Sequence, residues 1–435
     1  RAIVVPQTVA AGQTLLTLTI DGRPRHYVRE VDTEYLPGKI TTYDLSVSKK
    51  PNTGEYEVEL TGVSITAWEA ENVSHGDEAR EYVVVHNAVP GGLEKTVVER
   101  LEMDPTKIKN LKLTGKITTE DYTFMREKMT SLQRLNLKEV ESVVDGVYMI
   151  PESAFNRKYT LIKCVLPDKL EAICRNAFGN TSLTGTVLLP EGLKYVSGFN
   201  STKITNVSFP STLEAIGSGN DLDREYGYSQ SGQGSDYGAF YSCQSLMCEI
   251  AFPRSLKKIG DNAFRYSAIK GNLVLPQTLE TLGSHAFQSC TSISGALVIP
   301  DGITKIGESA FYNCGLTGTL TLPEGLVEIQ SGAFGNTSLK GELHIPESVQ
   351  LIGDAAFSGT LFNGTLILPS ELISLGAGVF GGCWRLSGVV EIPDNIVAVP
   401  SGLFRECANL EGVKLHKDVE VIESSAFENC FYINS

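Results

Sequence analysis

The most reactive side chains in this sequence are cysteines, and six of the nine recur at one position. They lie three residues after a phenylalanine, as Cys243, Cys290, Cys314, Cys383, Cys407 and Cys430. A column of thiols could form a metal or redox ladder, but such sites need clustered histidines or CxxC pairs, which the sequence lacks. Other copies of the repeat carry Thr or Ser there, which indicates a small buried slot. We interpret the cysteines as free thiols used as small apolar side chains, and we predict no metal and no cofactor.

Six histidines could supply acid–base chemistry, but the repeat places none of them with a serine or cysteine nucleophile. His344 is expected on an exposed strand beside Glu342, and His416 replaces a strand-ending proline. No GxSxG, HExxH or Walker-type loop occurs. A hydrolase with paired carboxylates stays open, because the sequence does not give the distances between Asp and Glu. We predict that the protein is not an enzyme.

The elements that position these residues belong to a repeat whose most visible part is the pair Ala-Phe. From Phe240 to Phe427 the repeat phenylalanines follow one another at steps of 23 or 24 residues. A fixed period of this length indicates a solenoid. One unit cannot bury its own apolar face, so neighbouring units must stack. We expect the phenylalanines to form one internal ladder, with one ring in each coil.

One unit, at residues 318–323, shows how each coil is built. Its alternation predicts a short strand with Leu320 and Leu322 buried and the threonines exposed. Pro323 ends the strand because it has no N–H to donate. A glycine opens seven such strands, and we interpret it as a turn residue.

The strand residues that point away from the core should form an exposed ladder on the inner, concave curve. Apolar side chains that face water can mark a protein-binding surface. Val, Ile and Thr also suit β ladders in general, which is the plainer interpretation. The predicted contact residues are Glu249, Asn272, Val274, Val298, Thr321, Glu342, His344, Ile367 and Glu391.

The period breaks once, between Phe199 and Phe240, which are 41 residues apart. The extra stretch, residues 217–236, is polar and rich in turn residues. The two tyrosines of this stretch and the tyrosine that follows it could form contacts with a partner at low entropic cost. A surface insertion that the fold tolerates explains the stretch equally well. The predicted contacts here are Tyr226, Tyr228 and Tyr237. The acidic residues match no EF-hand spacing, so no calcium site is predicted.

Two regions precede the repeat, and we place the domains at residues 1–75 and 76–435. Residues 1–75 alternate apolar and polar residues around turns at 21–22 and 51–54, which predicts an antiparallel β unit. Residues 76–140 predict a partly helical cap and the first repeats, with Thr118 and Asp121 starting a helix. A solenoid needs such an atypical unit to cover its open end.

Charge and hydropathy restrict the partners. A formal net charge of −14 argues against nucleic acids and anionic membranes, which require a basic patch. No apolar run is long enough to predict a transmembrane segment in this chain. Arg1 is not a start methionine, so we expect a mature or trimmed form from which a signal could have been lost.

Two parts of the chain resemble known families. The repeat over residues 150–435 is similar to the BspA-like, treponemal-type leucine-rich repeat. One coil shows its motif as Ile299-Pro300, Ile306-Gly307, Ala310-Phe311 and Cys314. The first domain resembles the closing part of the fimbrillin family, whose members are pilus and surface subunits of Bacteroidetes. The motifs are Val4-Val5-Pro6-Gln7, Thr19-Ile20-Asp21-Gly22, Leu36-Pro37-Gly38-Lys39 and Ile65-Thr66-Ala67-Trp68.

These resemblances imply a mainly β protein in two parts. A small antiparallel, fimbrillin-like sandwich portion would precede a leucine-rich-repeat solenoid with a partly helical N-terminal cap. Members of the repeat family are commonly surface proteins, and some are adhesins. We therefore expect an extracellular or outer-membrane-associated protein that binds a protein or glycan on a host or bacterial surface. The alternatives are a structural stalk or pilus-associated element without its own ligand, and a carbohydrate-binding module that uses the insertion tyrosines.

Overall fold

The computed structural model describes residues 82–217 and 237–433, together with the backbone of six strands between residues 8 and 67. Contacts divide the chain into two units, Arg1–Glu81 and Tyr82–Ser435. The domain boundary that the sequence predicts, between residues 75 and 76, falls outside the described residues.

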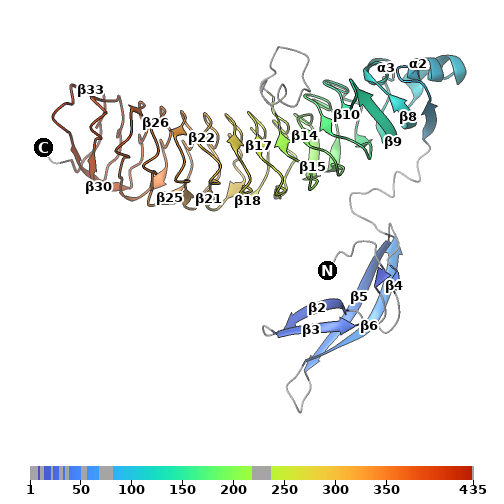
Figure 1. Ribbon diagram of the computed structural model, residues 1–435, viewed down its shortest axis with the longest axis horizontal. Coiled ribbons are helices and arrows are strands. Elements are labelled where there is room, and N and C mark those ends of the chain that lie inside the picture. The colour runs from blue at the N-terminus through green and yellow to red at the C-terminus, as the bar shows by residue number, and fades with distance from the viewer. Residues whose placement is uncertain are drawn as a thin grey trace. The chain divides into compact units, whose positions relative to one another are not determined.

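The first unit consists of antiparallel strand pairs (Figure 1). Its strands are β1 (Thr8–Val9), β2 (Thr14–Ile20), β3 (Arg23–Val28), β4 (Thr33–Glu34), β5 (Lys39–Lys49) and β6 (Tyr56–Ala67). β2 pairs with β3, β5 pairs with β6 over its whole length, and β1 pairs with β4. This is the antiparallel β structure that the alternation of the region predicts.

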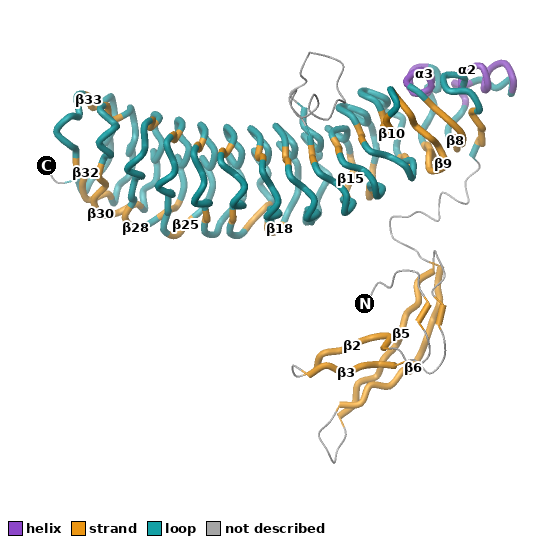
Figure 2. Tube along the Cα trace, viewed as in Figure 1, coloured by secondary structure: helices purple, strands orange, loops and turns teal. Residues whose placement is uncertain are grey.

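The second unit is a solenoid whose coils stack along one axis (Figures 1 and 2). The Leu-x-x-Ile part of each repeat contributes a two-residue strand to a row that we call the inner sheet. The row contains β12 (Ala172–Ile173), β14 (Tyr195–Val196), β16 (Ala215–Ile216), β17 (Lys258–Ile259), β19 (Thr281–Leu282), β22 (Lys305–Ile306), β24 (Glu328–Ile329), β26 (Leu351–Ile352) and β29 (Ser374–Leu375). Parallel pairing links each strand to the next coil without a break.

The inner sheet continues into the N-terminal cap. The cap strands are β7 (Val83–Asn87), β8 (Asn110–Ile117), β9 (Arg134–Val144) and β10 (Val147–Ile150). β7, β8 and β9 are parallel, β9 and β10 form an antiparallel pair, and β10 joins β12 in parallel. The cap and the solenoid therefore share one continuously hydrogen-bonded sheet, which ends at β7.

The Gly-x-Leu-x-Leu-Pro part of each repeat forms a second row, which we call the outer row. It contains β11 (Lys163–Val165), β13 (Thr184–Leu188), β15 (Lys203–Ser208), β18 (Gly271–Asn272), β20 (Ile293–Ser294), β21 (Leu297–Val298), β23 (Leu320–Thr321), β25 (Lys340–Gly341), β27 (Leu361–Phe362), β28 (Gly364–Thr365), β30 (Leu386–Glu391) and β32 (Leu410–Lys414). Apart from β11, which joins β9, these strands pair only in twos or threes. Two further strands, β31 (Ala398–Val399) and β33 (Val421–Ile422), pair with each other after the last strand of the inner sheet.

The expectation that the outer-row strands stack along the concave curve is wrong. The solenoid bends gently, with β14, β17, β22 and β26 on the inner side of the bend and β18, β21, β25 and β30 on the opposite side (Figures 1 and 2). Unbroken hydrogen bonding holds the inner sheet at the usual strand spacing of about 4.8 Å. The gaps in the outer row allow the coils to spread there, so the predicted ladder lies on the convex side.

The phenylalanines form the predicted internal ladder. The stacked rings are those of Phe155, Phe178, Phe199, Phe240, Phe264, Phe287, Phe311, Phe334, Phe357, Phe380, Phe404 and Phe427. Neighbouring ring centroids are 5.1 to 6.2 Å apart, and all rings before the last are buried. Phe199 and Phe240 are 5.8 Å apart, so the long step between them is one coil that carries an insertion.

Every Ala-Phe pair except Ala239-Phe240 lies between two residues in the left-handed backbone region. The preceding ones include Ser153, Asn176, Asn262, Ser309 and Gly378, and the following ones include Asn180, Ser242, Tyr266, Asn313, Asn336 and Gly382. Asn and Gly tolerate this conformation better than most residues. These positions turn the chain sharply on both sides of the phenylalanine, which places its ring in the core.

Six of the seven strand-opening glycines have the positive φ expected of a turn residue, and the exception is Gly318. A Cβ atom on Gly318 would lie 2.4 Å from the backbone nitrogen of Ala296 in the preceding coil. Gly318 is therefore required for close approach of two coils rather than for an unusual turn.

The N-terminal cap is partly helical, as the sequence predicts. Its helical segments are α2 (Leu93–Lys95), a π-helical turn (Thr96–Arg100), a 3-10 turn (Pro105–Lys107) and α3 (Thr119–Glu127). Thr118 and Asp121 form the predicted capping box at the start of α3. Tyr122 packs its ring edge-on against Phe155, at 5.5 Å, and so ends the phenylalanine ladder at the cap.

Candidate functional site

The nine predicted contact residues, Glu249 to Glu391, lie along the outer row, and we call them the ladder. All nine are exposed. Val274 is 69% exposed, Val298 50% and Ile367 71%. Their neighbours along the chain, such as Leu273, Leu297 and Leu366, are buried, as the alternation requires. The coils thus present aliphatic side chains to solvent at equivalent positions.

The two most exposed aliphatic residues of the ladder lie outside any strand, so the suitability of Val and Ile for strands does not explain why they stand there. Val274 lies beyond the end of β18, and Ile367 lies beyond the end of β28. Glu249, Glu342 and His344 also lie outside any strand. A preference of Val and Ile for β ladders therefore explains Val298, within β21, but not Val274 or Ile367.

Two ladder residues, Glu391 and His344, have an ionisable partner in a neighbouring coil. Glu391 forms an ion pair with Lys414 in the next coil. His344 Nε2 lies 3.7 Å from Glu324 Oε1, and both side chains are well exposed. Glu324 belongs to the preceding coil, so this contact joins two coils. Exposed pairs of this kind add little to stability, so they leave the surface available for contacts.

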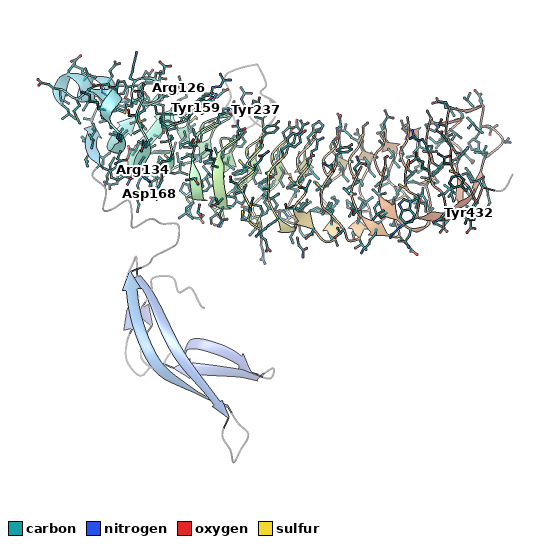
Figure 3. All side chains as sticks on the ribbon, turned by 180° about the vertical axis from the view of Figure 1, so that it is seen from behind. Arg126, Arg134, Tyr159, Asp168, Tyr237 and Tyr432 are labelled. Carbon is teal, nitrogen blue, oxygen red and sulfur yellow. The ribbon has the colours of Figure 1, made fainter. Side chains whose placement is uncertain are left out.

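Of the three tyrosines predicted as contacts at the insertion, the structure describes only Tyr237, which follows it. Tyr237 is 42% exposed, and its ring centroid lies 4.9 Å from that of Tyr241. Figure 3 shows the place of Tyr237 on the solenoid. Tyr226 and Tyr228 lie outside the described residues.

A second exposed aliphatic group lies on the inner sheet, and the sequence pattern did not lead us to it. Val327 is 40% exposed, Ile373 64% and Val397 46%. Backbone hydrogen bonds of 2.9 Å join Val327 to Gln350 and Gln350 to Ile373, so Val327 and Ile373 lie in one column. Val397 holds the equivalent position of the next coil, beside β31 and beyond the last strand of the inner sheet. All occupy the second position of the Leu-x-x-Ile segment. Their spacing in the sequence could have indicated the column, but the buried Leu and Ile dominate the pattern of that segment.

The same column is charged in the N-terminal half of the solenoid. Lys194 Nζ lies 3.6 Å from Glu171 Oε2, and Lys257 Nζ lies 3.1 Å from Glu214 Oε2. These pairs join neighbouring coils along the inner sheet. The inner sheet therefore changes from paired charges to aliphatic side chains along its length.

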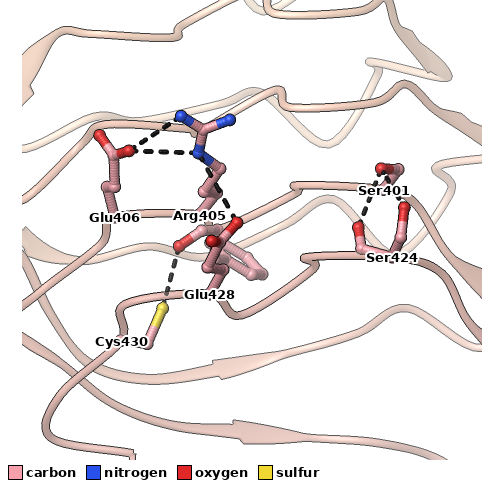
Figure 4. A network of polar contacts seen from close by, with 7 residues as sticks. Ser401, Arg405, Glu406, Ser424, Glu428 and Cys430 are labelled. Atoms are coloured by element: carbon pink, nitrogen blue, oxygen red, sulfur yellow. Dashed lines mark hydrogen bonds and ion pairs between the residues drawn. The ribbon is translucent and has the colours of Figure 1, made fainter.

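The cysteine column is part of the core. Each Sγ donates to the phenylalanine carbonyl of the preceding coil, as Cys290 does to Phe264 at 3.0 Å and Cys430 to Phe404 at 2.9 Å (Figure 4). Where threonine replaces cysteine, as at Thr337, the hydroxyl donates to the carbonyl of its own coil. Burial raises the pKa of the Cys290 thiol to about 12. A thiol that stays protonated is a poor nucleophile and a poor metal ligand.

We expect the buried thiols to resist modification in the native protein. An aromatic disulfide reagent should react with the partly exposed Cys248 and Cys430 at least about tenfold faster than with Cys290, because exchange requires an accessible thiolate. Mass spectrometry of peptides after timed labelling measures the rates. Labelling after unfolding is the control, and all nine thiols should then react. Rapid native labelling of Cys290 would show that the coils open readily.

The described residues offer little support for metal binding or for a catalytic histidine. Within residues 82–217 and 237–433, no three His, Cys, Asp or Glu side chains are arranged to hold a metal ion. His416 is used structurally, with Nε2 3.1 Å from the carbonyl oxygen of Ile396. In the same part of the chain, none of the helices has the length and apolar character that crossing a membrane requires.

Comparison with protein families gives one match. The model of the BspA type leucine rich repeat region matches in six copies, over residues 148–220, 236–361 and 327–435. The matched residues make up more than half of the chain. No match was found among curated proteins.

Solved leucine-rich repeat structures are also similar. One from Bacteroides ovatus is 21% identical, covers 86% of this chain and 94% of its own, and has a TM-score of 0.48. A leucine rich cell surface protein of Faecalibacterium prausnitzii is 19% identical, covers 83% and 84%, and has a TM-score of 0.34. The T. pallidum leucine rich repeat protein is 29% identical, covers 38% and 78%, and has a TM-score of 0.34.

Proposed function

Because the chain belongs to the BspA type leucine-rich repeat family, we propose that it is a non-catalytic recognition protein of the cell surface. Its partner is a protein on a host or bacterial surface. The ladder of the outer row, from Glu249 to Glu391, forms the contact. Residues 1–75 serve as the fimbrillin-like portion through which the solenoid is attached or presented.

One observation carries this proposal, namely the exposure of Val274 and Ile367 outside any strand. Single exposed aliphatic residues are common, but these recur at the same position of the repeat as Val298. Solenoids offer long surfaces to which successive coils contribute equivalent residues. None of the nine ladder residues is aromatic, so the ladder suits a protein better than a sugar.

A binding screen of the purified full chain tests the proposal. Immobilised host extracellular-matrix proteins and mucins are the probes, and surface plasmon resonance is the measurement. We expect saturable binding to at least one protein. Circular dichroism of the same sample shows that it is folded. No binding across the panel by a folded sample would overturn the proposal and favour a structural stalk without its own ligand.

A further inference from the structure

A different surface of the solenoid carries aromatic rings. It is formed by the turns around each phenylalanine between residues 237 and 336, and we call it the turn edge. The rings of Tyr237 and Tyr241 are 4.9 Å apart, and those of Tyr241 and Tyr266 are 5.8 Å apart in neighbouring coils. Tyr237 is 42% exposed and Tyr266 39% exposed. Tyr241 and Tyr266 meet edge to face, at an interplanar angle of 84°, so the three rings form a stepped patch that is exposed at Tyr237 and Tyr266.

Tyr266 occupies a backbone position that does not favour it. Its φ is +60°, and the equivalent residues of other coils are mostly Asn, Ser or Gly, such as Asn180, Asn313 and Gly359, with Arg157 and Glu406 as the other long side chains. A bulky side chain is unusual in the left-handed region, where Asn and Gly are tolerated. The Tyr266 ring is exposed, so packing in the core does not explain its presence. Strain of this kind is characteristic of functional positions.

A guanidinium group lies on the patch. Arg265 is centred 4.9 Å from the centroid of the Tyr266 ring, and its Nη2 donates to the Tyr266 hydroxyl at 3.3 Å. Its Nη1 donates to Asn262 Oδ1 at 3.1 Å. Among the described residues, no carboxylate forms an ion pair with Arg265. Each terminal nitrogen retains a second N–H that can donate to an anionic ligand.

Amides and hydroxyls continue the edge beyond the rings. Asn313 Nδ2 donates to Ser289 Oγ at 3.2 Å, and Asn336 Nδ2 donates to the Tyr312 hydroxyl at 2.7 Å. Both asparagine side chains are exposed and keep unused donors and acceptors. Tyr, Ser and Asn together form adaptable polar surfaces with large flat contact areas.

We propose that the turn edge binds a carboxylated sugar. A pyranose presents C–H groups on its faces and hydroxyls at its rim, which suits the rings of Tyr241 and Tyr266 flanked by amides. The Arg265 guanidinium binds the carboxylate, as arginine does where planar acids are recognised. Asn313 and Asn336 bind hydroxyls of the next residues of the glycan. The site lies away from the ladder, so it is independent of the proposed protein contact.

Isothermal titration of the full chain with three probes tests the site. The probes are 3′-sialyllactose, trigalacturonic acid and, as the neutral control, lactose. We expect at least one acidic probe to bind ten times more tightly than lactose. Tighter binding of 3′-sialyllactose would identify the ligand as a sialylated glycan, and tighter binding of trigalacturonic acid would identify it as a uronate glycan. Equal binding of lactose, or no binding of any probe, would overturn the proposal.

Variants separate recognition from folding. Tyr266→Asn puts a residue suited to positive φ at this position, so the melting temperature should stay the same or rise while affinity falls at least tenfold. Arg265→Gln should remove the preference over lactose. Tyr159→Ala, at an exposed tyrosine elsewhere on the solenoid (Figure 3), should change nothing. If Tyr266→Asn lost binding and also had a lower melting temperature, the role of Tyr266 would be structural, and the proposed sugar site would be overturned.

Discussion

Replacing Phe311 with alanine is expected to lower the free energy of unfolding by roughly 3–5 kcal/mol. The ring is fully buried, and parallel rings lie on both sides of it, Phe287 at 5.5 Å and Phe334 at 5.6 Å. Truncation opens a cavity between them that the coils cannot close, because backbone hydrogen bonds hold Phe311 to Ala333 in the next coil. The two neighbouring rings would lose their stacking contacts at once.

Chemical denaturation of the full chain measures this effect, and amide exchange within residues 287–334 locates it. A solenoid is stabilised by contacts between neighbouring coils, so the loss of protection should be largest near the substitution. Phe431→Ala is the control, since that ring is 76% exposed, and it should change stability by no more than about 0.5 kcal/mol. If Phe311→Ala behaved like the control, the ring ladder would not be the main stabilising feature.

Asp121→Ala is expected to destabilise the cap by roughly 3 kcal/mol or more. The carboxylate is 1% exposed, and Oδ1 accepts from the Leu93 N–H at 2.8 Å. Oδ2 accepts from the N–H groups of Gly91 at 2.8 Å and Thr118 at 3.0 Å. One carboxylate therefore accepts hydrogen bonds from backbone N–H groups at the starts of two helical segments. Its removal leaves three donors without an acceptor, and each costs about 1–3 kcal/mol where water cannot replace it.

Hydrogen exchange at Gly91, Leu93 and Thr118 should speed up together in Asp121→Ala, and thermal unfolding should begin at a lower temperature. Glu127→Ala removes an exposed carboxylate from the same helix, so it should leave both measurements nearly unchanged. Equal behaviour of the two variants would mean that α3 and the segment from Gly91 fold independently of this carboxylate.

The features that repeat in the sequence were predictable because stacking repeats them in space. From Phe240 to Phe427 the phenylalanines recur at steps of 23 or 24 residues, and in the structure their rings stack in one column. The capping box at Thr118 was also predictable, because it depends only on residues three apart. The contacts of Asp121 with Gly91 and Leu93 were not, because they join segments that the sequence does not bring together.

The identity of the continuous sheet could not be read from the pattern. Both Thr319–Leu322 and Leu326–Ile329 place apolar residues at spacings that fit a buried edge, so either could supply the main row. Which segment forms the continuous sheet depends on which row of strands keeps its hydrogen bonds when the solenoid bends. In the structure that edge is the Leu-x-x-Ile segment, including Glu328 and Ile329. The ladder consequently lies on the convex side, although its side chains are exposed as expected.

The binding surface was predictable only in part. Exposure of Val274 and Ile367 follows from alternation, which the sequence shows directly. The turn edge was not found, because it depends on φ at Tyr266 and on the stacking of Arg265 over that ring. Asn and Ser recur at the same turn positions, and this enrichment is a signal in the sequence that could have indicated positive φ there.

The most direct test of the proposed recognition surface compares two matched pairs of substitutions. Val298→Glu with Ile367→Glu changes the ladder, and Val327→Glu with Ile373→Glu changes the inner sheet at side chains of similar exposure. Binding to the matrix protein or mucin found in the screen is measured for both. The ladder pair should weaken binding roughly 100-fold, because it places two charges in the contact, while the melting temperature changes by no more than about 2 °C. The inner-sheet pair should bind normally. Loss of binding in the inner-sheet pair alone would contradict the account and place recognition on the concave side.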